Sequence, residues 1–151
     1  MKKIYMILIP ILLLSLTGCF EKTKTLTCTR DNETTNNVLI SSTVNVEYDG
    51  DKLINFKLET VTDLSKSNLL NDEFVDSLIR TSKDTSSKYE GKSGIEANYE
   101  KVDVGVKYTL KVVFDELKDE EIKDFDPKLY NKTMKLDELK SGYLKDWKCE
   151  G

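Results

Sequence analysis

Between residues 38 and 58, apolar and polar side chains alternate on both sides of a short turn, and this pattern limits the possible fold most strongly. The apolar positions before the turn are Val38, Ile40, Val44, Val46 and Tyr48, and those after it are Ile54, Phe56 and Leu58. Alternation with a period of two is typical of a strand with one buried face. Asp49-Gly50 between the two segments is a strong hairpin signal. The sequence therefore predicts an antiparallel hairpin with one face in the core.

A helix and a second hairpin follow. Phe74, Val75, Leu78, Ile79 and Ser82 share one face at helical spacing. Asn71 can cap this helix, and the acidic residues at positions 72 and 73 suit the positive end of the helix dipole. We expect the helix to end at Gly91. Alternation returns over residues 95–99 and 106–114, with a turn near residues 103–105, which predicts the second hairpin.

The remaining elements complete an α+β order. Residues 26–29 are β-prone and predict a first strand, followed by a polar loop over residues 31–37. Leu136, Leu139, Tyr143 and Trp147 recur at helical spacing, with Gly142 as a weak point. We predict an α+β fold: an antiparallel sheet of about four to five strands with a helix packed on one face and a short C-terminal helix.

Charge excludes one class of partner. The formal net charge is −4, and no dense cluster of Lys or Arg occurs along the 151 residues. An acidic surface without a basic stripe repels the phosphate backbone. We therefore expect no nucleic-acid binding.

The N-terminus has the organisation of a secretory leader. Met1-Lys2-Lys3 supplies a positive start, and an uncharged, largely apolar run over residues 4–16 follows. A run of roughly 13 residues is typical of a signal peptide and is too short to span a bilayer comfortably. Residues 1–18 are predicted to be this signal peptide.

The leader ends in Leu16-Thr17-Gly18-Cys19, which resembles the lipobox of bacterial lipoproteins. The resemblance implies cleavage before Cys19 and attachment of diacylglyceryl and further acyl chains such as palmitate, which together anchor a protein stably. Residues 19–24 would then be the lipidated N-terminus and tether, and residues 25–151 a single α+β domain. The expected location is the extracytoplasmic face of the cell membrane, or the outer membrane in a cell with two membranes.

Two further cysteines remain, Cys28 and Cys149. An even number of cysteines in an exported domain predicts a disulfide, because the compartment permits oxidation. A reactive thiol and a metal site are the alternatives. The chain contains no His and no Cys-x-x-Cys, which disfavours zinc and thioredoxin-like chemistry.

Residues 115–126 are the main candidate for other chemistry, with seven acids and two lysines. The interpretations are a solvated acidic surface, a calcium site, or a carboxylate pair for sugar hydrolysis. We favour the solvated surface and assign no catalytic residue, metal ligand or cofactor. Phe125 and Tyr130 fit no clear period and are candidates for packing or for lining a groove.

Several short motifs in this order suggest a family. Tyr48-Asp49-Gly50-Asp51-Lys52-Leu53 lies in the first hairpin, Tyr89-Glu90-Gly91-Lys92-Ser93-Gly94-Ile95 leads into the second, and Val112-Val113-Phe114-Asp115 ends it. With the lipobox, these resemble the YehR-type family of small bacterial lipoproteins of unestablished function. The resemblance implies a fold and a location at a membrane, and it does not imply a catalysed reaction.

The predicted function is a membrane-anchored extracytoplasmic binding or interaction module, and we do not expect an enzyme. Its partners would be the membrane, through the lipid on Cys19, and an envelope protein, a peptide or a small ligand. The alternatives are a carboxylate-based envelope hydrolase and an inhibitor of an extracellular enzyme. An exposed strand edge or an uncovered sheet face could supply the binding surface.

Overall fold

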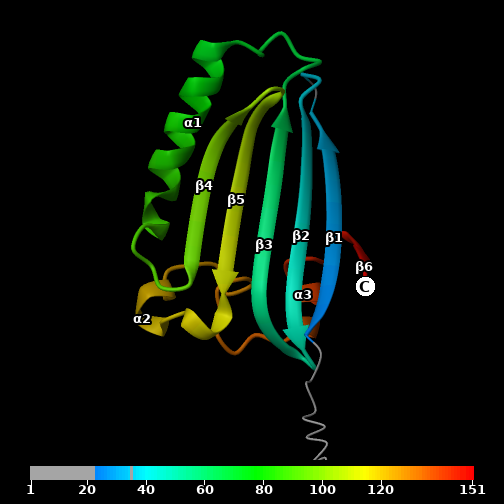
Figure 1. Ribbon diagram of the computed structural model, residues 1–151, viewed down its shortest axis with the longest axis vertical. Coiled ribbons are helices and arrows are strands. Elements are labelled where there is room, and N and C mark those ends of the chain that lie inside the picture. Colours follow the sequence, from blue (N-terminus) through cyan, green and yellow to red (C-terminus); the bar gives the residue numbers. More distant parts are fainter. Residues whose placement is uncertain (1–22, 35) are drawn as a thin grey trace, which may run out of the picture.

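Six antiparallel strands form one sheet in the computed structural model, which describes residues 23–34 and 36–151. The strands are β1 (Lys24–Glu33), β2 (Leu39–Asp49), β3 (Lys52–Asp63), β4 (Ile95–Val102), β5 (Gly105–Val113) and β6 (Lys148–Glu150). Their order across the sheet is β4-β5-β3-β2-β1-β6 (Figure 1). The predicted α+β class is confirmed, with six strands in place of four to five.

Both predicted hairpins are present. The β2–β3 turn consists of Gly50 and Asp51, because Asp49 pairs with Lys52. Gly50 has a φ of 61°, and a positive φ at a glycine in the first turn position is the signature of a type II′ hairpin. Strand β1 is longer than expected, since residues 31–33 continue the strand and do not form a loop. Glu33 still pairs with Leu39, so the ladder satisfies backbone groups that a loop would leave to water.

Helix α1 (Asp72–Ser86) begins as the sequence predicts. The Asn71 side chain accepts a hydrogen bond of 2.9 Å from the Phe74 N–H. The α-helix ends at Ser86, earlier than expected, and a 3₁₀ turn (Ser87–Tyr89) leads to Gly91. Val75, Leu78 and Ile79 belong to the same apolar cluster as Val106 of β5. Helix α1 therefore packs over the β4–β5 side of the sheet.

The C-terminal segment differs most from the prediction. A 3₁₀ turn (Phe114–Glu116), α2 (Asp119–Ile122) and α3 (Leu136–Ser141) precede β6. The expected helix through Trp147 is wrong, because α3 ends at Ser141, with Gly142 as its C-cap, and the chain then turns into β6. Trp147 is nonetheless buried. Its helical spacing therefore predicted burial correctly, although the backbone at Trp147 is not helical. Within the described residues, no helix combines the length and apolarity needed to cross a membrane.

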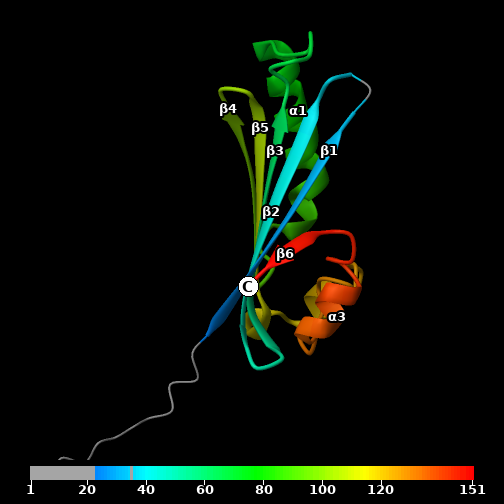
Figure 2. The same ribbon diagram turned by 90° about the vertical axis from the view of Figure 1, so that its right-hand side faces the viewer.

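The core lies on one face of the sheet, which we call the inner face. Figure 2 shows α1 and the C-terminal segment on this same side. A larger apolar cluster lies under the C-terminal segment and includes Phe56, Val112 and Leu139. A smaller one lies under α1 and includes Val75 and Val106. The inner face is thus covered in two parts by two different segments.

One polar row crosses the inner face between these two clusters. Strand register places its members side by side, one from each of five neighbouring strands: Tyr99, Tyr108, Thr60, Ser42 and Arg30. The Ser42 and Thr60 hydroxyls lie 3.0 Å apart, which satisfies the buried serine. The Arg30 guanidinium lies 4.6 Å from the centre of the Trp147 ring.

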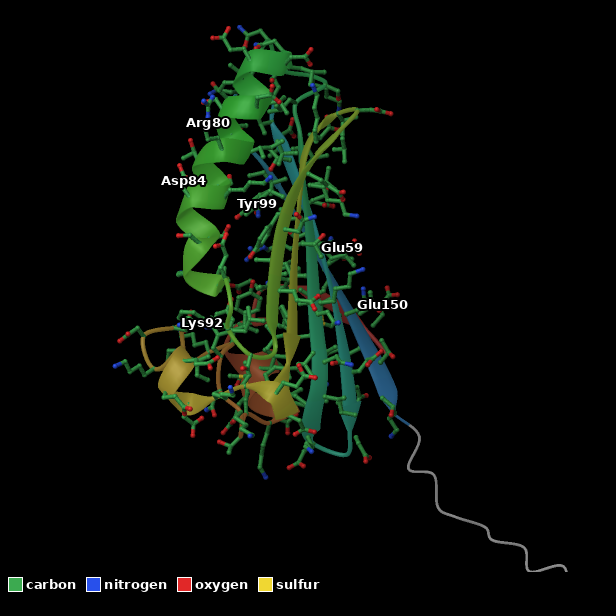
Figure 3. All side chains as sticks on the ribbon, turned by 60° about the vertical axis from the view of Figure 1, so that its left-hand side comes forward. Glu59, Arg80, Asp84, Lys92, Tyr99 and Glu150 are labelled. Atoms are coloured by element: carbon green, nitrogen blue, oxygen red, sulfur yellow. A yellow bond between two sulfur atoms is a disulfide. The ribbon has the colours of Figure 1, made fainter. Side chains whose placement is uncertain are left out.

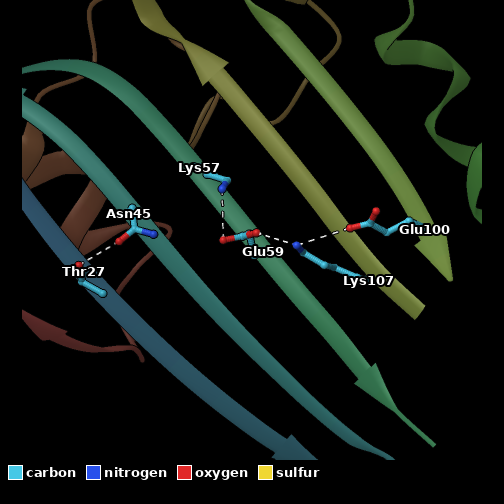
Figure 4. Close-up of polar contacts among 6 residues, drawn as sticks. All are labelled: Thr27, Asn45, Lys57, Glu59, Glu100 and Lys107. Carbon is cyan, nitrogen blue, oxygen red and sulfur yellow. Dashed lines mark hydrogen bonds and ion pairs between the residues drawn. The ribbon is translucent and has the colours of Figure 1, made fainter. Parts of the chain in front are cut away.

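The opposite, outer face is polar. Glu59 lies 3.0 Å from Lys107 and 3.3 Å from Lys57, and Lys107 also lies 3.5 Å from Glu100 (Figure 4). The hydrogen bond from Lys107 is the main reason why the pKa of Glu59 lies below its ordinary value. Alternating side chains explain both faces, since the buried apolar residues in these strands point inward and most charged residues point outward, with Arg30 as an exception.

Candidate functional site

Strand β4 forms one edge of the sheet, and half of its backbone groups have no strand partner. The Val113 N–H donates a 2.8 Å hydrogen bond to the Gly94 carbonyl, which fixes the phase of the β4–β5 ladder. In an antiparallel pair, alternate residues direct N–H and C=O toward the partner strand. Ala97, Tyr99 and Lys101 therefore direct theirs away from β5. These residues form the free edge of β4.

A cleft of about 450 Å³ lies between this edge and the C-terminal end of α1. Its lining includes Lys83, Tyr89, Glu90, Glu96, Ala97 and Tyr99. Tyr99 lies between α1 and β4 in Figure 3, whereas Arg80 and Asp84 project from the helix away from the sheet. A second hollow of about 460 Å³ lies at the other end of the same junction and is lined by Asp72, Lys101 and Asp103, among others. We call the two hollows together the α1–β4 cleft.

Aromatic rings form the wall of the cleft. Tyr99 stacks on Tyr108, with ring centroids 4.5 Å apart. Tyr89 contacts Phe125 and Tyr130 at centroid distances of 5.4 and 5.9 Å. Offset and edge-to-face contacts of this kind fix ring positions. Two packed aromatic rings, Tyr89 and Tyr99, therefore line the cleft beside the free backbone groups of β4.

Burial raises the pKa of Tyr99 and Tyr108 above the ordinary tyrosine value. It also raises the pKa of Tyr130, whose hydroxyl is further affected by a hydrogen bond with Tyr89. A raised folded-state pKa favours the neutral phenol in the folded protein. The corresponding stability is present below the unfolded pKa of about 10 and is lost as pH rises further.

We expect Tyr108→Phe to make the fall in stability above about pH 10 less steep, because one fewer proton is released on unfolding. Urea unfolding at several alkaline pH values measures this slope. Tyr48→Phe, at a half-buried position beside the β2–β3 turn, is the matched control for loss of a hydroxyl. Equal slopes for wild type and Tyr108→Phe would contradict the assignment.

The mouth of the cleft carries charges of both signs. At the N-terminal end of α1, the Lys101 Nζ lies 2.6 Å from the Asp72 Oδ1. This hydrogen bond lowers the pKa of Asp72 and raises that of Lys101. The Asp72 side chain is 89% exposed, so solvent screens the pair and it contributes little to stability. It can open without a large cost.

The predicted cysteine pair is joined by a disulfide. Cys28 of β1 lies directly opposite Cys149 of β6, with Cα atoms 4.0 Å apart and a sequence separation of 121 residues. Neither sulfur is available as a thiol or as a metal ligand. Cys19, the predicted lipidation site, and the predicted signal peptide lie outside the described residues.

The acidic segment 115–126 engages separate partners. Asp115 lies 3.0 Å from Lys52. Glu121 accepts hydrogen bonds from the Ser93 N–H at 2.7 Å and from Lys118 at 3.3 Å, and the Ser93 bond is the main cause of its lowered pKa. Throughout residues 23–34 and 36–151, no group of three or more potential ligand residues is placed to hold a metal ion. The segment connects the end of the sheet to the C-terminal residues.

Phe125 and Tyr130 both pack and line a surface. They contact each other at a centroid distance of 5.0 Å, and Tyr130 is buried. Both also line a hollow of about 270 Å³ beside α2.

The α1–β4 cleft itself was not predicted, since sequence alternation identifies strands without showing which of them lies at an edge.

Comparison with known proteins supports the fold alone. The structure is similar to the NMR structure of the E. coli YehR protein, with a TM-score of 0.61 and 13% identity over 86% of this chain and 92% of that one. It is also similar to the NMR structure of a protein from Streptococcus pneumoniae TIGR4, with a TM-score of 0.52 and 9% identity over 99% of this chain and 96% of that one. No protein-family model matches the sequence. No curated protein matches it either.

Proposed function

We propose that this chain is an exported lipoprotein, anchored to a membrane through lipid on Cys19, that binds a partner in the α1–β4 cleft. The observation that carries the binding role is the free edge of β4 beside an aromatic-walled cleft of about 450 Å³. Binding pockets of 300–1,000 Å³ typically combine apolar walls with a few polar groups that fix orientation. Here the open backbone groups of β4 supply the polar component.

The lipobox and the disulfide support the proposed location outside the cytoplasm. A disulfide between Cys28 and Cys149 suits an oxidising compartment outside the cytoplasm. Strand β1 begins at Lys24, so only a few residues separate the proposed lipid from the sheet. A segment of five residues spans at most about 18 Å. The domain would therefore stay close to the bilayer.

Strand β1, which follows the proposed tether in the sequence, is well separated from the cleft across the sheet. The order β4-β5-β3-β2-β1-β6 places three strands between β4 and β1. Anchoring through the residues before β1 would consequently leave the β4 edge free. This separation suits a domain that captures a partner while it is held at a membrane.

The proposed lipidation and membrane location are tested by mass spectrometry of the mature N-terminus and by partition into a detergent phase. We expect a diacylated or triacylated Cys19 and recovery of the protein with membranes. Cys19→Ala should be released into the soluble fraction or keep its leader. Wild-type protein with an intact, unmodified N-terminus in the cytosol would refute the proposal.

The binding role is tested in intact cells with a photo-crosslinking amino acid at position 90, at the mouth of the cleft. Position 43 on the outer face is the control, since Thr43 lies on the central strand β2 and faces away from α1. We expect a specific adduct, identifiable by mass spectrometry, at position 90 and none at position 43. The same adducts at both positions, or none at either, would contradict a binding role for the cleft.

A further inference from the structure

We propose that the α1–β4 cleft takes an extended polypeptide segment with basic ends, which pairs with β4 as an added strand; this inference rests on the proposed binding function. Ala97, Tyr99 and Lys101 direct their N–H and C=O groups toward the free edge. In the described part of the chain, no backbone hydrogen bond outside the β4–β5 ladder involves these three residues. Helix α1 packs beside the strand and leaves its edge unpaired.

The free edge of β4 is long enough to pair with a single added strand. β4 contains eight residues, which span about 26 Å at 3.3 Å per residue. The two hollows of about 450 and 460 Å³ lie near its two ends. Side chains of an added strand would point alternately toward Tyr89 and Tyr99 and toward solvent. Backbone hydrogen bonds would supply affinity, and the aromatic wall would select the inward residues.

The position of helix α1 favours pairing of β4 with a single peptide strand over pairing with β4 of a second copy of the chain. The helix runs alongside β4 in Figure 1, and Figure 2 shows that it lies on the inner face of the sheet. A second copy paired antiparallel through β4 would bring two α1 helices together on one face at the seam. One extended segment needs only the width of one strand, about 4.8 Å. The geometry therefore favours a peptide over self-association.

The other edge of the sheet is better protected against pairing. Strand β6 has only three residues. Short edge strands are a common device against edge-to-edge pairing. β4 is longer, with eight residues, and has Ala97 and Tyr99 at its centre. This asymmetry between the two edges is expected if one of them is kept open for a partner.

Charges at the cleft select the composition of the segment. At one end, Glu90 and Glu96 outnumber Lys83. At the other, Asp72 and Asp103 outnumber Lys101. An extended segment with a Lys or Arg near each end would complement both regions, and its binding would weaken as salt screens these exposed groups.

The test uses the full chain in detergent micelles and a blocked peptide of alternating valine and threonine flanked by lysines. We expect saturable NMR shifts in the amides of residues 95–102 and in α1. Methylating the peptide nitrogens of one alternate set should abolish binding, whereas methylating the other set should preserve it. Replacing the flanking lysines by glutamates should weaken binding at least tenfold.

Ala97→Pro tests the protein side, because it removes one outward N–H while keeping every β4–β5 hydrogen bond. Proline is tolerated at such edge positions, and we expect a folded variant with at least tenfold weaker peptide binding. Asn98→Pro is the contrasting variant, since it removes a ladder N–H and should lower stability.

Three outcomes would overturn the inference: no shifts in β4 at millimolar peptide, equal binding by both methylated peptides, or shifts confined to β1. A concentration-dependent dimer paired through β4 would assign the edge to a second copy. These results are separable from the proposed function. Specific crosslinks at position 90 with none of the peptide effects would keep the binding role and remove strand addition.

Discussion

Replacing Cys28 and Cys149 together by alanine should lower the free energy of unfolding by about 3–5 kcal/mol. The disulfide closes a loop of 121 residues, and a cross-link over so long a loop removes much entropy from the unfolded chain, with an upper limit of roughly 5 kcal/mol. It also attaches β6 to β1, where β6 has only three paired residues. Urea unfolding of the wild type and the double variant measures the difference.

Reduction of the wild type with dithiothreitol provides the control. It should shift the wild-type unfolding curve toward that of the double variant and leave the double variant unchanged. Reduction should also release β6 first, which amide hydrogen exchange would detect as lost protection at residues 148–150. Equal unfolding midpoints for wild type and double variant in oxidising buffer would show that the bond adds no stability.

Phe56→Ala should destabilise the protein by about 3–5 kcal/mol, the range observed for aromatic truncations in cores. Phe56 is fully buried in the central part of β3. Its ring also contacts Tyr143 edge-to-face at a centroid distance of 5.6 Å. The substitution removes apolar area from water-excluded packing and opens a cavity between the sheet and the C-terminal segment.

Lys57→Ala is the matched control, because the neighbouring residue on the same strand faces outward. Its ion pair with Glu59 measures 3.3 Å and its side chain is 48% exposed. Exposed pairs contribute about 0–1 kcal/mol, so the unfolding midpoint should change little. A loss at Lys57 equal to the loss at Phe56 would contradict the division of the sheet into an inner and an outer face.

The candidate site shows why strand prediction and site prediction differ. Ile95, Ala97 and Tyr99 alternate in the sequence, and this pattern predicts β4 correctly. The same pattern also occurs in β2 and β3, which lie inside the sheet. Only the order of the strands makes β4 an edge, and only the packing of α1 makes that edge one side of a cleft.

The C-terminal segment shows a second kind of difference. Tyr143 and Trp147 follow helical spacing, yet only residues 136–141 are helical. The helical spacing predicts which side chains are buried. A turn after Gly142 buries the same side chains that a longer helix would have buried. Beyond it, Lys148–Glu150 has no alternation long enough to predict a strand. Lys148–Glu150 is a strand because it pairs with β1 beside the disulfide.

The sequence alone determined the two hairpins, the start of α1, the pairing of Cys28 with Cys149 and the inward and outward faces of the strands, except at Ile54, where a bulge places Leu53 in the core instead. These features depend on local periodicity, turn chemistry and cysteine number, which neighbouring residues encode. The tertiary structure decided the order of the strands, the end of α3, the existence of β6 and the cleft beside β4. Each of these depends on contacts between segments far apart in the chain, where competing packings differ in energy without differing in local pattern.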